Sequence, residues 1–204
     1  ALEGIISKIT LSISDDGILN SDDVHLLSKI IFSQIVRVPD YLEREMKHVR
    51  ELTDQYKNGM RENLNLSKEK LASIEKAFST ADEIKNLILT HTFDNEKFEK
   101  YCGVLEEKTW IVFYNGIRQF MPFVTSDNPV LLVDTKRHPV KLTEIGLTSN
   151  ELVIMFPVSP SLLIGIYPSN LYLDKLKEFD RKRVVISERD LKFIMDVNTE
   201  LIVN

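Results

Sequence analysis

The stretch Thr109-Trp110-Ile111-Val112-Phe113-Tyr114-Asn115-Gly116 marks the point at which this chain of 204 residues changes character. Aromatic and β-branched residues fill most of its first six positions, which is typical of a strand. The Asn-Gly pair that follows favours the tight turn of a β-hairpin. We therefore expect a strand at residues 109–114 and a returning strand at residues 120–125.

The residues that follow this hairpin indicate further strands and then helices. Short apolar runs predict strands at residues 130–133, 152–156 and 162–167. The polar residues 135–150 are expected to form a loop, with a short strand near Val140. Helical spacing returns at residues 170–179 and 187–201, and Ser187 is a suitable start for the second helix.

Upstream of residue 108 the apolar residues recur at helical spacing throughout. Ser21 is the predicted N-cap of a helix that Pro39 ends. Pro39 also suits the first turn of the next helix, at residues 40–57, with Asn58-Gly59 as its C-cap. Further helices are expected at residues 2–9, from Ser67, from Thr80 and at residues 95–105.

These elements together predict an α+β fold in one domain, residues 1–204. Its N-terminal helical half, residues 1–107, packs on a mainly antiparallel sheet half, residues 108–168. Residues 169–204 form a helical end.

The composition excludes several classes of protein. Twenty-six basic and 31 acidic residues give a net charge of −5, which disfavours general nucleic-acid binding. A single cysteine excludes a disulfide framework and a multi-cysteine metal site. No apolar run approaches the roughly 18 residues of a membrane helix, and the first residues lack the features of a secretory signal. A cytoplasmic location is therefore expected.

Two catalytic patterns match the sequence literally. Ser67 and Lys70 fit the S-x-x-K pattern of serine β-lactamases, but no K-T-G follows Asn128 to complete that site. Pro39-Asp40 with Glu106-Glu107-Lys108 fits a nuclease pattern, although Pro39 reads as a helix start. A metal-dependent, nuclease-like hydrolase built from other acids stays open. No histidines or cysteine share metal-ligand spacing, so the sequence predicts no metal site and assigns no cofactor.

Gln34 is a polar residue on a helix stripe that should be apolar. Arg37 follows three residues later and projects from the same side of the helix. A buried amide and guanidinium need partners, because an unsatisfied polar group costs about 1–3 kcal/mol. Either both belong to an internal network, or both line a pocket in which Arg37 binds an anion.

A second polar group stands where an apolar segment ends, at Ser126, Asp127 and Asn128, before Pro129. Such residues often bond their own backbone in a turn. Polar residues at a strand end are also a common place for binding groups. The sequence leaves both interpretations open.

Three segments carry a resemblance to a known family. Residues 34–39, 123–130 and 156–160 contain Q-x-x-R-x-P, F-x-T-S-D-N-P and P-x-S-P in that order. The chain resembles, over essentially its whole length, the bacterial family called domain of unknown function 4238. The resemblance implies no known activity, but it makes Gln34, Arg37, Ser126, Asp127, Asn128 and Ser159 signature positions. Members of that family begin with a histidine-bearing strand segment, so we expect this chain to be a trimmed core.

Our hypothesis is that these six residues meet at one end of the sheet. Asp127 is the candidate catalytic base, Arg37 the anion clamp, and Gln34, Ser126, Asn128 and Ser159 complete the binding site. The predicted function is binding of a small anionic or phosphate-bearing ligand. In the alternative, the signatures are structural and the charged helices between residues 40 and 107 form a protein-interaction module.

Overall fold

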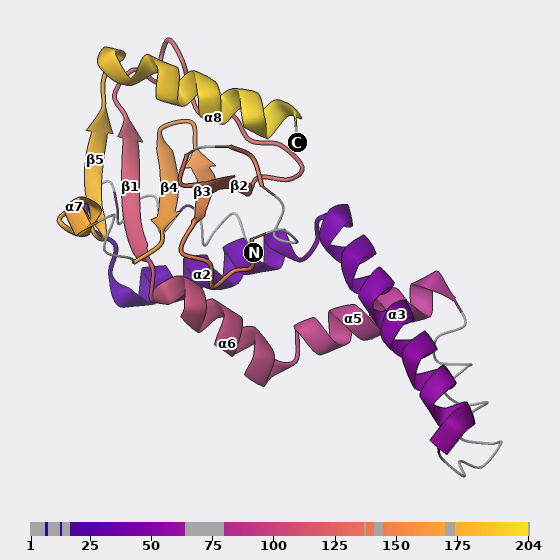
Figure 1. The fold of residues 1–204 in the computed structure, drawn as a ribbon. Helices are drawn as coiled ribbons and strands as arrows, with labels where there is room; N and C mark the ends of the chain where they lie inside the picture. Colours follow the sequence, from indigo (N-terminus) through magenta and orange to yellow (C-terminus); the bar gives the residue numbers. More distant parts are fainter. Residues whose placement is uncertain are drawn as a thin grey trace. The chain divides into compact units, whose positions relative to one another are not determined.

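The computed structural model describes residues 7, 13, 17–63, 80–136, 138–140, 145–169 and 174–203. The chain forms two compact units, one made of Ala1–Ile35 with Glu99–Asn204 and the other of Val36–Phe98. Figure 1 shows the helices and strands of both. No helix in the described ranges is both long enough and apolar enough to cross a bilayer.

The first unit is built on a five-stranded sheet with the order β2-β3-β4-β1-β5. Its strands are β1 (Thr109–Asn115), β2 (Leu131–Asp134), β3 (Leu152–Ser159), β4 (Leu162–Tyr167) and β5 (Lys182–Ile186). The pairs β2–β3, β3–β4 and β4–β1 are antiparallel, and only β1–β5 is parallel. Helices thus precede a mostly antiparallel sheet and a C-terminal helix follows it, which confirms the α+β prediction.

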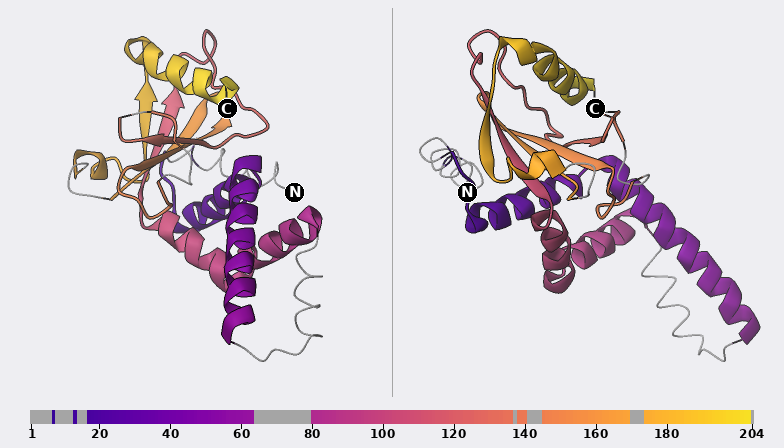
Figure 2. Two further views of the ribbon diagram at one scale, coloured as in Figure 1. Left: turned by 45° about the vertical axis from the view of Figure 1, so that its right-hand side comes forward. Right: turned by 60° about the vertical axis from the view of Figure 1, so that its left-hand side comes forward.

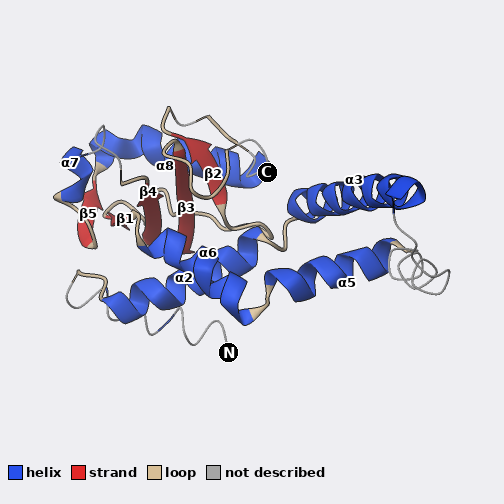
Figure 3. Cartoon of the chain, turned by 60° about the horizontal axis from the view of Figure 1, so that its bottom comes forward, coloured by secondary structure: helices blue, strands red, loops and turns tan. Residues whose placement is uncertain are grey.

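Helices cover the two faces of this sheet (Figure 3). On one face α8 (Leu191–Val203) buries Ile194, Val197 and Leu201 among alternate residues of the strands. On the other face lie α2 (Ser21–Ile35) and α6 (Asn95–Glu106), also seen in the two views of Figure 2. The Trp110 indole N–H donates to the Leu105 carbonyl at 2.9 Å, which ties β1 to the end of α6.

The predicted hairpin at Asn115-Gly116 does not form. β1 pairs with β4 and β5, and residues 116–125 contain turns and irregular backbone rather than a strand. Asn115 is fully buried, and its side chain accepts from the Ile117 N–H at 3.0 Å and donates to the Met121 carbonyl at 2.7 Å. These bonds close a local turn after β1. The strand that pairs with β1 is the long, apolar β4, and not residues 120–125.

The sequence-based prediction did not include β5. Its first two residues are charged and exposed and the third is half-buried, so this strand lacks the apolar run that predicted the other strands. Of the helix predicted at residues 170–179, residues 170–173 lie outside the described ranges. The remaining residues form the short helix α7 (Asp174–Lys177) and a turn. The predicted helix at residues 187–201 is confirmed: a 3₁₀ turn, Glu188–Asp190, leads into α8.

The start of α2 differs by one residue from the prediction. Asn20, not Ser21, is the cap: its Oδ1 accepts from the Asp23 N–H at 2.8 Å, and Asp23 accepts from the Asn20 N–H at 3.3 Å. The Ser21 hydroxyl instead accepts a hydrogen bond from Arg181 at 2.9 Å.

The second unit packs α3 (Pro39–Asn63) against α5 (Ala81–Thr92) around Leu42, Ile84 and Ile88. Pro39 begins α3, as predicted, but the helix continues past the expected end at Asn58-Gly59. Thr80 caps α5 in a capping box with Glu83. The helices expected at residues 2–9 and from Ser67 lie outside the described elements.

Candidate functional site

The polar turn before β2 holds three of the six predicted site residues. The Ser126 hydroxyl donates to the Asn128 carbonyl at 2.7 Å, which closes the turn on itself. Asp127, between them, is exposed, so its carboxylate is open to solvent. The serine therefore holds the backbone, and the carboxylate is left available for an external group.

Asn128 carries an anomaly. Its Oδ1 atom is buried and has no hydrogen-bond partner among the described residues. A buried acceptor without a donor costs about 1–3 kcal/mol, because the group has lost its bond to water. An O–H or N–H donor, from water or from a bound molecule, would recover that free energy.

Ser159 ends β3 at the same end of the sheet as this turn. β2 begins with Leu131 opposite Met155, so the residues before β2 run antiparallel toward the end of β3. The Phe123 N–H donates to the Pro160 carbonyl at 3.0 Å, which joins the two segments. The Ser159 hydroxyl lies 3.1 Å from that of Ser161 and thus belongs to the β3–β4 turn.

Gln34 and Arg37 occupy different parts of the molecule. Gln34 is half-buried near the end of α2, in the first unit. Arg37 is exposed and belongs to the second unit, just before α3. The structure thus brings Ser126, Asp127, Asn128 and Ser159 to one sheet end, while their convergence with Gln34 and Arg37 stays a prediction.

Among the described residues outside this turn, three titratable groups have shifted pKa values. Burial, with a smaller contribution from Glu99, raises the pKa of the Cys102 thiol to about 11, which disfavours the thiolate that a nucleophile needs. Burial lowers the pKa of Lys108. A hydrogen bond from the His138 backbone N–H holds the pKa of Asp134 below its usual range. In the described ranges, no three His, Cys, Asp or Glu residues are grouped so that they could hold a metal ion.

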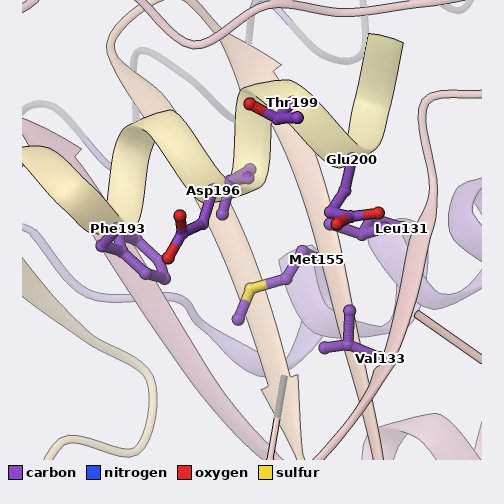
Figure 4. A pocket seen from close by; sticks show the side chains of 8 residues that line it. Leu131, Val133, Met155, Phe193, Asp196, Thr199 and Glu200 are labelled. Carbon is purple, nitrogen blue, oxygen red and sulfur yellow. The ribbon is translucent and has the colours of Figure 1, made fainter. Parts of the chain in front are cut away.

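A pocket of about 180 Å³ lies between α8 and strands β2 and β3 (Figure 4). We call it the α8 pocket. Its apolar lining comes from both the sheet and the helix: Leu131, Val133, Met155, Phe193 and Val197. All but the half-buried Phe193 belong to the buried core of this sheet face.

Among the described residues, the polar groups that line the α8 pocket come from the helix. Asp196 and Glu200 follow each other by one turn, and Thr199 stands beside them. In Figure 4 the Asp196 side chain extends toward Met155 with the Phe193 ring beside it, and Glu200 extends toward Leu131. The pocket therefore combines an apolar floor with two acidic side chains.

A family model matches residues 1–203, essentially the whole chain. The chain belongs to the family described as "Protein of unknown function (DUF4238)". Neither the curated proteins nor the solved structures contain a significant match to this DUF4238 chain.

The sequence-based prediction for this DUF4238 protein did not include the α8 pocket. Its floor comes from Leu131, Val133 and Met155, which the sequence predicted only as members of strands. The acidic residues Asp196 and Glu200 lie in the helix predicted at residues 187–201 but were not among the predicted site residues. Their four-residue spacing beside Phe193 was the available signal, since it places two like charges next to an aromatic ring on one helix face.

Proposed function

We propose that this DUF4238 protein binds a small polar ligand that carries a phosphate or carboxylate group together with O–H or N–H donors. The buried, unpartnered Asn128 Oδ1 is the observation that supports this most directly. A donor on the ligand would complete the hydrogen bonding of that atom, which makes the complex more favourable than the empty turn.

In this proposal Arg37 recognises the anionic group and Gln34 orients it. Ser126 and Ser159 hold the two turns that frame the site. Asp127 is the candidate general base, because its exposed carboxylate stands next to the unpartnered acceptor. We further propose that the protein is bacterial and that it lies in the cytoplasm, a setting that suits its single, unpaired cysteine.

The test is a thermal-shift screen with inorganic phosphate, nucleotides and sugar phosphates, followed by calorimetry on any ligand that raises the Tm. We expect Asn128→Ala and Arg37→Ala to weaken binding by about tenfold or more, the loss of one strong hydrogen bond or ion pair. Arg50→Ala is the matched control, because Arg50 is an exposed arginine on α3. A screen without any shift in the wild-type protein, or equal losses for Arg37→Ala and Arg50→Ala, would contradict the proposal.

A second candidate function is that of a protein-interaction module. The internal bonds of Ser126 and Ser159 are compatible with purely structural signatures. On α3, Leu52 is 50% exposed among charged, exposed neighbours such as Lys47 and Glu51. This alternative predicts no ligand shift in the screen, and loss of cross-linking to a partner on Leu52→Glu. The nuclease-like alternative gains no support from the described residues.

A further inference from the structure

We infer that Asn198, in the middle of α8, is the residue that positions the proposed ligand-binding turn at residues 126–128. This role rests on the function proposed above, and it adds to that site a positioning residue from a helix that holds none of the signature positions. Hydrogen bonds that hold the chain just before the turn from two sides are the observations that carry it.

Asn198 is a polar residue on the apolar side of α8. It lies four residues after Ile194 and three before Leu201, and both of these are buried in the core between α8 and the sheet. Asparagine is also a poor residue for the interior of a helix, because its amide competes for backbone hydrogen bonds. A half-buried amide at this place is favourable only when another segment supplies its partners.

The partners of the Asn198 amide are two backbone groups that flank Phe123. Its Nδ2 donates to the Pro122 carbonyl at 2.9 Å, and its Oδ1 accepts from the Val124 N–H at 3.1 Å. Residues 122–126 belong to no helix or strand, so no regular element supplies these bonds. One side-chain amide thus does for this segment what a neighbouring strand does in a sheet.

The other side of the same segment is held by the turn between β3 and β4. The Phe123 N–H donates to the Pro160 carbonyl at 3.0 Å, and the Phe123 side chain is buried in the core beneath α8. This is the pattern of an extended segment, in which the N–H of one residue points away from the backbone groups that flank it. Because Pro160 follows Ser159, these bonds also fix one signature turn relative to the other.

The turn at residues 126–128 begins two residues after Val124. The bond from the Ser126 hydroxyl to the Asn128 carbonyl sets the shape of this turn. The bonds at residues 122–124 set where the turn lies, and therefore where the Asn128 Oδ1 and the Asp127 carboxylate lie. A site that is held in place before the ligand arrives loses less conformational entropy on binding.

Asn198→Leu tests this role, because leucine has a similar size and suits the apolar side of α8 but cannot bond the segment. Exchange of single backbone amides is followed by ¹⁵N NMR on the full chain. We expect the Val124 amide to exchange about tenfold faster or more, from the loss of one hydrogen bond. The amide of Ile164, a fully buried residue of the central strand β4, should keep its rate. The amide signals of Asp127 and Asn128 should shift.

Two further variants serve as controls. Thr199→Ala removes the exposed hydroxyl of the next residue on α8 and should change none of these signals beyond its own neighbours. Asn198→Asp keeps the acceptor for the Val124 N–H, so the Val124 amide should retain more protection than in Asn198→Leu. Equal acceleration of Val124 and Ile164 would indicate a general loss of stability and overturn the positioning role. Unchanged Asp127 and Asn128 signals would overturn it as well.

Inorganic phosphate is the probe of the site itself. Titration followed by the same NMR signals should give a Kd about tenfold higher for Asn198→Leu than for the wild type, and an unchanged Kd for Thr199→Ala. The same Kd in the wild type and Asn198→Leu would contradict the role of Asn198. If phosphate does not bind the wild type, the anion binding proposed above is contradicted, and the amide rates with the Asp127 and Asn128 signals still decide the role of Asn198.

Discussion

Gly165 lies in β4 beneath the aromatic rings of Phe113 and Tyr167. A Cβ atom at this position would stand 2.7 Å from Phe113 Cε2 and 2.9 Å from Tyr167 Cε2, both closer than van der Waals contact allows. The two rings pack edge to face with their centroids 6.5 Å apart, and a shift of either ring to admit a Cβ would disturb that contact. A single hydrogen atom at this position is therefore what permits the aromatic packing.

Gly165→Ala should lower the free energy of unfolding by about 1–3 kcal/mol, the usual cost of overpacking a core. Gly103→Ala is its matched control, because the Cβ that this change adds to α6 meets no atom within 4 Å apart from its chain neighbours and the backbone of its own helix. In a helix the control should be neutral or stabilise the protein by up to about 1 kcal/mol. Urea denaturation followed by circular dichroism measures both, and equal effects of the two changes would refute the packing argument.

At the scale of elements, local chemistry sets where a helix begins, whereas a distant contact can decide which residue caps it. Pro39 begins α3 where the sequence predicts, since its fixed φ suits the first turn of a helix, and α2 has already ended at Ile35. The cap of α2 is also local, but Asn20 and Ser21 are both good caps and the sequence does not separate them. Arg181, 160 residues away, bonds the Ser21 hydroxyl, and Asn20 caps the helix.

Asn20→Ala should therefore destabilise the protein by about 1 kcal/mol, the typical value of an N-cap. Ser21→Ala removes only an exposed hydrogen bond and should cost less than about 0.5 kcal/mol. Thermal denaturation of the two variants side by side checks the order. A larger loss for Ser21→Ala would mean that Ser21 is the true cap.

At the scale of the whole molecule, the described residues of the two compact units form cores of different size. Val36–Phe98 is held by Leu42, Ile84 and Ile88 with their half-buried neighbours, whereas the sheet unit buries residues on both faces of β1, β3 and β4. Units with separate cores can open independently, and the one with fewer buried apolar contacts opens at the lower free energy.

Ile84→Ala should lower the free energy of opening of α3 and α5 by about 2–5 kcal/mol, the usual cost of the cavity. Amide exchange in these helices should become faster, and the strands should stay protected. Ile154→Ala, at a fully buried position in β3, should speed exchange in the strands instead. Hydrogen exchange with mass spectrometry distinguishes the two patterns. Uniform acceleration across the chain by Ile84→Ala would show that the units open together.

The candidate site was predictable to the extent that its residues are adjacent in sequence. Ser126, Asp127 and Asn128 were found because four small polar residues interrupt an apolar run. The bond of Ser126 to the backbone of its own turn was one of the two interpretations that the sequence left open. The unpartnered Oδ1 of Asn128 could not be foreseen, because it depends on backbone geometry within the turn. The α8 pocket was missed because β2, β3 and α8, far apart in sequence, build it together.

The sequence by itself determined where most helices and strands lie, since apolar period, caps and prolines act over a few residues. It also determined the family, through three short motifs in order. Only the tertiary structure decided that β1 pairs with β4 and not with residues 120–125, that β5 joins the sheet, and that α8 leaves a pocket over Met155. Strand pairing and cavities arise from packing between distant segments, and such packing is a property of the assembled core rather than of any local pattern.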